Sequence, residues 1–151
     1  MSGVVPKISL GNLSQFRVAI ISASWHEQIC AGLIAGARRA LLEAKIEPEP
    51  VIFVPGSFEL PLAAQLSLDS GFDAAVVLGV VLRGETPHFD YVCQGVTQGV
   101  IDVQLKFSKP IGYGVLMCNN LTQAIARSGV PGSKEDKGFD SAIAALALLQ
   151  L

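Results

Sequence analysis

The sequence contains few charged side chains and few of the residues on which catalysis often depends. Of its 151 residues only 16% are charged, and it has three cysteines, two histidines and one tryptophan. The cysteines have no CxxC spacing, so the sequence indicates neither a disulfide framework nor a zinc site. Basic residues are scattered and the formal net charge is −2, which argues against a nucleic-acid partner. We expect the cysteines to be small buried residues in a reducing compartment.

Long apolar runs are also missing. Each apolar stretch is interrupted by charge, Gly or Pro before it reaches the roughly 20 residues that cross a bilayer, so we expect no membrane partner. Residues 1–15 lack the continuous apolar core of a signal peptide, and we expect a flexible N-terminal segment and a cytoplasmic location. Half of all residues are nonetheless hydrophobic, which is more than a soluble monomer of this length needs. This surplus indicates contacts between subunits.

Apolar strands and helical periods alternate along residues 16–151, which we expect to form one domain. We predict strands at 16–23, 51–54, 74–82 and 111–117, and helices at 26–44, 57–68, 87–107, 121–128 and from 139 onward. Thr86 is expected to cap the third helix, with Pro87 in its first position. The last helix is apolar nearly all round, so we expect a neighbouring subunit to cover part of it. The order predicts an α/β fold, a three-layer α/β/α sandwich with a four-stranded parallel sheet.

Chemically useful side chains follow the first two predicted strands. Ligands of open parallel sheets bind beyond the carboxyl ends of the strands, where this sequence places Trp25 and Glu59. Trp25 could stack on a flat heterocycle or could simply pack against the next helix. Glu59 could accept hydrogen bonds from sugar-like hydroxyl groups, or it could be an acid favoured by the dipole of a helix start.

The segment after the third strand suggests an anion site. Gly84 lets a ligand approach the backbone closely, and the N–H groups of Glu85, Thr86 and His88 lie at a helix start, where phosphate is favoured. A capped helix start without a ligand is the alternative.

Three further side chains carry charge or titrate near neutrality. His88 could transfer protons or could be structural. Arg127 and Lys137, at the end of one predicted helix and close to the start of the next, could reach a phosphate or could be solvated surface charges. Singly, none of these residues decides a function.

Together the segments resemble the lumazine synthase family from about Phe16 to Leu151. The segments that carry the resemblance are VPGSFELPLAAQ, FDAAVVLGVVLRGETPHFDYV and IGYGVLMCNNLTQAIARSG. The resemblance implies a flavodoxin-like fold and a transferase that acts in the penultimate step of riboflavin biosynthesis. That enzyme condenses 5-amino-6-(D-ribitylamino)uracil with 3,4-dihydroxy-2-butanone 4-phosphate to 6,7-dimethyl-8-ribityllumazine, phosphate and water. No cofactor and no metal is implied.

The resemblance also implies roles for residues on the uracil side of the site. Trp25 would stack on the pyrimidine ring. The segment that binds the ribityl chain matches Ser57, Phe58 and Glu59. The backbone that contacts the ring matches Val80, Val81 and Leu82.

On the phosphate side, the resemblance implies that His88 transfers a proton and that Lys137 lies at the substrate site. The phosphate-binding residues of the family match Gly84, Glu85, Thr86 and Arg127. Tyr113 matches the position whose side chain closes the pocket from the adjacent subunit. The site would therefore lie between subunits of at least a homopentamer.

Several positions depart from the family pattern. Many members have Asn at His26, Phe at Trp25, and Leu-Thr-Thr-Asp-Thr where this chain has Leu116–Asn120. The segment from Arg127 to Lys137 is two residues longer than in members that form 60-subunit shells, which favours a free pentamer. The alternatives are a non-catalytic flavin or lumazine carrier and a shell-forming structural protein with a vestigial pocket.

Overall fold

A computed structural model describes residues 3–151 of the chain. The strands β1 (Val18–Ala23), β2 (Ile52–Val54), β3 (Ala74–Leu82) and β4 (Ile111–Cys118) form one sheet in the order β2-β1-β3-β4. All three pairings are parallel. The predicted four-stranded parallel sheet is confirmed, and its order is that of flavodoxin-like folds.

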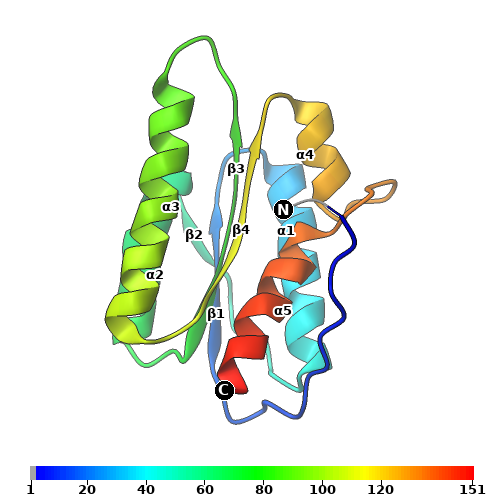
Figure 1. Ribbon diagram of the computed structural model, residues 1–151, viewed down its shortest axis with the longest axis vertical. Coiled ribbons are helices and arrows are strands. Elements are labelled where there is room, and N and C mark those ends of the chain that lie inside the picture. Colours follow the sequence, from blue (N-terminus) through cyan, green and yellow to red (C-terminus); the bar gives the residue numbers. More distant parts are fainter. Residues whose placement is uncertain (1–2) are drawn as a thin grey trace.

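Helices cover both faces of the sheet (Figure 1). One face carries α1 (Glu27–Glu43) and α5 (Lys137–Leu149), and the other carries α2 (Leu60–Asp69) and α3 (His88–Phe107). The short helix α4 (Leu121–Arg127) follows β4. The three-layer α/β/α sandwich predicted from the alternation of elements is therefore confirmed.

The central strand β3 supplies side chains to two separate cores. Val76, Leu78 and Val80 face α1 and α5, whereas Ala75 and Val77 face α2 and α3. A strand covered on both faces has no polar side, which is why residues 74–82 are apolar throughout. The predicted bounds of this strand agree with the structure at both ends.

The last helix is covered mainly by its own chain. Ala142 and Leu146 of α5 join the core beneath the sheet, and the backbone of Gly138 lies against Leu33 of α1. Leu148 remains exposed. Contacts with α1 on one side and the sheet on the other thus account for most of the apolar character that suggested a neighbouring subunit.

Two predicted helix starts are wrong in detail. Thr86 does not cap α3, because Pro87 occupies the capping position and the helix begins at His88. The last helix begins at Lys137 instead of Phe139, because the Asp136 carboxylate accepts a 3.0 Å hydrogen bond from the Phe139 N–H. The segment before α2 also differs, since a 3₁₀ turn at Ser57–Glu59 precedes the α-helix.

Residues 3–15 contain no helix or strand, but part of this segment packs on the domain. Leu13 is buried, and its N–H donates to the Ala44 carbonyl at 2.9 Å. The Gly11 N–H donates to the Gln150 side chain at 2.7 Å. Flexibility of residues 1–15 stays a prediction, and Met1 and Ser2 lie outside the described residues. No helix in the described chain has the length and hydropathy needed to cross a membrane.

Candidate functional site

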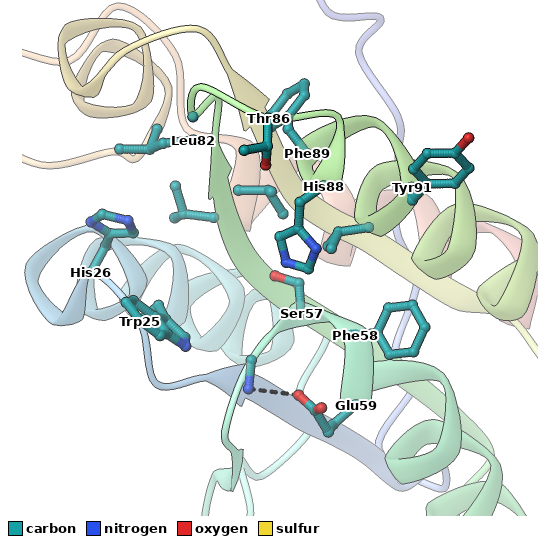
Figure 2. Close-up of a pocket in the computed structure, with 15 residues that line it drawn as sticks. Trp25, His26, Ser57, Phe58, Glu59, Leu82, Thr86, His88, Phe89 and Tyr91 are labelled. Carbon is teal, nitrogen blue, oxygen red and sulfur yellow. Dashed lines mark hydrogen bonds between the residues drawn. The ribbon is translucent and has the colours of Figure 1, made fainter.

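A cavity of about 730 Å³ lies at the carboxyl ends of β1, β2 and β3 (Figure 2). Its volume is in the range of small-molecule sites, and its place in the sheet is the one expected for ligands of this fold. The predicted site residues that line it are Trp25, Ser57, Phe58, Glu59, Val80, Val81, Leu82, Gly84, Thr86 and His88. The structure therefore brings most of the predicted site residues together in one place.

The first wall of the cavity follows β1. Trp25 is 67% exposed at the mouth, so the flat face of its ring is open to a ligand. Ser24 ties this segment to the end of β2, because its hydroxyl donates to the Val54 carbonyl at 2.8 Å. His26 also lines the cavity and has a left-handed backbone with φ of 56°. His, like Asn, adopts this conformation more readily than most residues.

The second wall is the turn from Pro55 to Glu59. The Glu59 carboxylate accepts a 2.9 Å hydrogen bond from the Gly56 N–H, which fixes the side chain at the edge of the cavity. The Ser57 hydroxyl is buried and has no hydrogen-bond partner among residues 3–151. A buried hydroxyl without a partner is costly, so Ser57 is suited to bind a polar ligand atom. Phe58 lies against Gly95 of α3.

The third wall is the segment between β3 and α3. Space around the Gly84 backbone is open, because a Cβ built there would meet no heavy atom within 4 Å. His88 lies in the first turn of α3, and in Figure 2 its ring and the Ser57 side chain point into the same part of the cavity. Asp90, also in the first turn of α3, forms an ion pair with Arg83 at 3.5 Å.

Four predicted site residues do not line this cavity, namely Glu85, Tyr113, Arg127 and Lys137. Tyr113 lies on β4 and faces the core on the α2 and α3 side, where its hydroxyl is 2.7 Å from the Thr97 hydroxyl. Burial raises the pKa of Tyr113 above its ordinary value, while the hydrogen bond with Thr97 opposes that rise. Within its own chain, Tyr113 is therefore engaged elsewhere.

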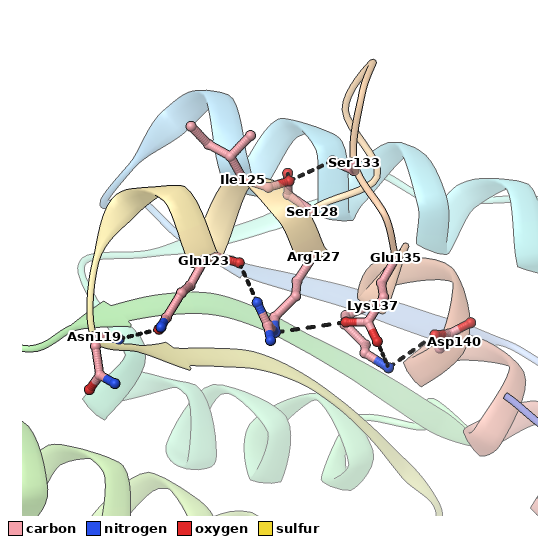
Figure 3. A network of polar contacts seen from close by, with 9 residues as sticks. All are labelled: Asn119, Gln123, Ile125, Arg127, Ser128, Ser133, Glu135, Lys137 and Asp140. Atoms are coloured by element: carbon pink, nitrogen blue, oxygen red, sulfur yellow. Dashed lines mark hydrogen bonds and ion pairs between the residues drawn. The ribbon is translucent and has the colours of Figure 1, made fainter. Parts of the chain in front are cut away.

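Arg127 and Lys137 lie together beyond β4 in a chain of polar contacts (Figure 3). The Arg127 guanidinium donates to the Gln123 carbonyl at 2.9 Å and lies 3.7 Å from the Glu135 carboxylate. Lys137 lies 3.7 Å from the same carboxylate and 3.4 Å from Asp140. Ion-pair hydrogen bonds are strongest near 2.7 to 2.9 Å, so the ion pairs that these two cations form with Glu135 are weak.

The three cysteines show no sign of a reactive or metal-binding site. Burial raises the pKa of the Cys30, Cys93 and Cys118 thiols, which disfavours the nucleophilic thiolate. Within the described chain, no group of three or more His, Cys, Asp and Glu side chains could hold a metal ion.

Comparison with known proteins identifies the family. The family model described as 6,7-dimethyl-8-ribityllumazine synthase matches residues 15–151. The chain belongs to this family. A lumazine synthase of Streptomyces coelicolor is 50% identical over 97% of this chain and 92% of its own length. A lumazine synthase of Paenarthrobacter aurescens is 56% identical over 89% of this chain and 83% of its own length.

Five residues line the cavity that the sequence did not select as site residues, namely His26, Gly56, Phe89, Tyr91 and Val92. His26 and Gly56 lie next to predicted residues in the turns after β1 and β2. Their sequence neighbours were therefore a usable signal. The other three are on the first turns of α3, where only the orientation of the helix decides which side chains face the cavity. The RGETPH segment does not show which side chains of α3 face the cavity.

Proposed function

We propose that the chain condenses 5-amino-6-(D-ribitylamino)uracil with 3,4-dihydroxy-2-butanone 4-phosphate to give 6,7-dimethyl-8-ribityllumazine, phosphate and water. The observation that carries the proposal is that one cavity joins Trp25, the Ser57–Glu59 turn and His88. These groups offer an aromatic face, hydrogen-bonding groups for a polyol and a titratable imidazole in one place. Membership of the lumazine synthase family agrees with this assignment.

Each wall of the cavity fits one part of the two substrates. The Trp25 ring stacks on the pyrimidine, with the ends of β3 at Val80–Leu82 beside it. The Ser57 hydroxyl and the free oxygen of the Glu59 carboxylate bind the ribityl chain. The open backbone of Gly84–Thr86 receives the phosphate, since unpaired N–H groups at a helix start attract anions.

The chemistry needs orientation and proton transfer more than a strong nucleophile. The amine attacks the ketone and one water leaves as a Schiff base forms, phosphate then leaves by elimination, and ring closure by the second amine releases another water. Two substrates held in one cavity react as if at very high concentration, with effective molarities up to about 10⁵ to 10⁸ M in well-oriented cases. His88, which faces the cavity, moves protons between the successive intermediates.

The complete site includes residues of a neighbouring subunit. Tyr113, Arg127 and Lys137 do not line the cavity of their own chain, although the phosphorylated substrate needs cations. Large apolar side chains also remain exposed on α2 and α3, namely Leu62, Leu66, Ile101 and Leu105. A ring places one such surface against a different surface of the next subunit. A homopentamer would supply cations to the phosphate and would cover these apolar side chains. We propose that this homopentamer is located in the cytoplasm.

A steady-state assay of lumazine absorbance tests the activity directly. Purified protein with both substrates is expected to form the chromophore, and omission of either substrate should abolish the signal. His88→Ala should lower kcat by about 10- to 10⁴-fold, because proximity remains when the proton shuttle is lost. A folded wild-type protein that binds the uracil substrate but forms no chromophore would be a carrier and would refute the proposed reaction.

The assembly is tested by mass and by mixing two variants. Light scattering should give the mass of five chains; a mass near that of 60 chains would refute the free pentamer. Co-expression of His88→Ala with Arg127→Ala should restore activity at a low concentration of the phosphorylated substrate. In a ring of randomly mixed chains, about a quarter of the interfaces combine wild-type His88 of one chain with wild-type Arg127 of its neighbour. No restoration would place Arg127 and His88 in the same chain's site.

A further inference from the structure

The segment Gly84–Thr86 has almost no support of its own. Within residues 3–151, no group accepts a hydrogen bond from the backbone N–H of Gly84, Glu85 or Thr86. All three residues are exposed, and the space beside Gly84 is empty. Because a turn without internal hydrogen bonds can adopt many shapes, its conformation must be set by the residues on either side of it.

Arg83 joins the two sides of this turn. Its backbone N–H donates to the Cys118 carbonyl at 2.9 Å, and its Nε–H donates to the Asn119 side chain at 2.9 Å, both at the end of β4. Its guanidinium also lies over the Phe89 ring, 4.4 Å from the ring centre, and 3.5 Å from the Asp90 carboxylate. Phe89 and Asp90 belong to the first turn of α3. One side chain therefore links the end of β4 to the start of α3, across the unsupported turn.

We propose that Arg83 is a positioning residue that holds Gly84–Thr86 in the shape in which its N–H groups bind the substrate phosphate. The inference rests on the proposed function, in which this turn receives the phosphate. The guanidinium acts through the turn, because a hydrogen bond, an ion pair and a stacking contact already engage it with protein groups.

The geometry of arginine is needed for this role. A planar guanidinium can donate from Nε to Asn119 while its face stacks on Phe89, whereas the compact ammonium of lysine cannot do both. Asn119, the residue just after β4, is the acceptor of that hydrogen bond. Position 119 departs from the common family pattern, and the hydrogen bond from Arg83 gives its Asn side chain a role. Lysine at position 83 keeps the charge and removes the planar clamp, so Arg83→Lys isolates the positioning role.

The test measures KM for each substrate separately. We expect Arg83→Lys to raise the KM for the phosphorylated substrate by about 10- to 100-fold, the size of effect that a small misplacement produces. The KM for the uracil substrate and the melting temperature should stay close to those of the wild type. Unchanged KM values, or an equal rise for both substrates, would overturn the proposal.

The chain offers a matched control at the opposite end of the sheet. Arg17 lies just before β1, is ion-paired with Glu49 at 2.6 Å and stacks on Phe72 at 4.2 Å. Its contacts are thus of the same kinds as those of Arg83, but they lie far from the cavity walls. Arg17→Lys should leave both KM values unchanged. A rise equal to that of Arg83→Lys would reveal a general effect of losing a stacked arginine and would overturn the proposal.

A second variant separates positioning from direct contact with the substrate. If Arg83 acts through the clamp, Asn119→Ala should raise the same KM, and the double variant should be no worse than Arg83→Lys alone, because the two residues share one contact. If Arg83 bound phosphate itself, Asn119→Ala would have little effect and the proposal would fail.

Phosphate binding can also be followed without turnover. Titration of the isotope-labelled wild-type protein with inorganic phosphate should shift the amide signals of Gly84 and Thr86, and Arg83→Lys should weaken this binding by a similar factor. Absence of these shifts in the wild type would overturn the positioning proposal. A wild-type protein that shows these shifts but forms no chromophore would refute the proposed reaction. It would leave intact the proposal that Arg83 positions the phosphate-binding turn.

Discussion

A methyl group added at Gly138 would overlap the carbonyl oxygen of Leu33 and would lie 2.6 Å from the Leu33 Cα. Real Cβ atoms essentially never approach another heavy atom closer than 3.0 Å, so α5 and α1 would have to move apart at this point. The obstructing atoms are backbone, and no side chain can rotate away to relieve the contact. We therefore expect Gly138→Ala to strain the packing of two whole helices.

The cost of that strain can be bracketed from known overpacking effects. Extra methyl groups in well-packed cores destabilise proteins by about 1 to 3 kcal/mol, and contact with rigid backbone places this variant at about 3 kcal/mol or above. For a chain of this length, 1 kcal/mol shifts the melting temperature by about 2 to 4 °C, so a fall of about 6 to 12 °C is expected.

Urea unfolding followed by far-ultraviolet circular dichroism, at one fixed subunit concentration, measures the effect. Gly84→Ala is the matched control for stability, because no heavy atom lies within 4 Å of its added Cβ. The control should change the free energy of unfolding by less than about 0.5 kcal/mol. A Gly138→Ala protein as stable as this control would refute the close approach of α1 and α5.

Three further predictions concern the site. Gly84→Ala should fold normally but raise the KM for the phosphorylated substrate, since the methyl group would occupy the space that the phosphate approaches; an unchanged KM would remove Gly84 from the phosphate site. Glu135→Gln should lower that KM by up to about fivefold, because it frees Arg127 and Lys137 from exposed ion pairs worth about 0.2 to 1 kcal/mol. A rise in the KM would show that Glu135 instead holds the two cations in place. Tyr113→Phe should cost about 0.5 to 1.5 kcal/mol at neutral pH, measured by urea unfolding. The pKa of Tyr113 is raised in the folded state, so its contribution to the free energy of unfolding is present below the ordinary tyrosine pKa of about 10 and is lost as pH rises through the raised value. Tyr113→Phe lacks this titration and should therefore lose less stability than the wild type as the pH becomes alkaline.

The layers of the fold could be predicted from sequence because they depend on patterns that few other structures share. The unbroken apolar run of β3 is compatible with a parallel strand between two helical layers, and the alternation of elements then determines the sandwich. Helix starts were harder to predict. Thr86 and Asp136 are both good capping residues, but only Asp136 caps a helix, since the choice depends on how the preceding loop approaches.

The candidate site was predictable to the extent that it follows the strand ends. Trp25, Glu59 and His88 each come shortly after a strand, and a parallel sheet brings those positions together without further information. Tyr113 and Arg127 belong to a different part of the same chain and do not line this cavity, and in the proposed assembly their contribution depends on a second subunit. The position of one subunit against another is not encoded in any local pattern. Only the resemblance to the family suggested Tyr113, and the charge of Arg127 left a phosphate site and a solvated surface charge equally open.

Trp25, described above as one wall of the cavity, is also the only tryptophan in the chain. Selective excitation of tryptophan therefore reports on the mouth of the cavity and on nothing else in the protein. Because the indole is 67% exposed, its emission in the unliganded chain should be that of a solvated ring. A flat heterocycle that stacks on it would quench this light, so the protein carries its own optical sensor of occupancy, and binding can be titrated without a label.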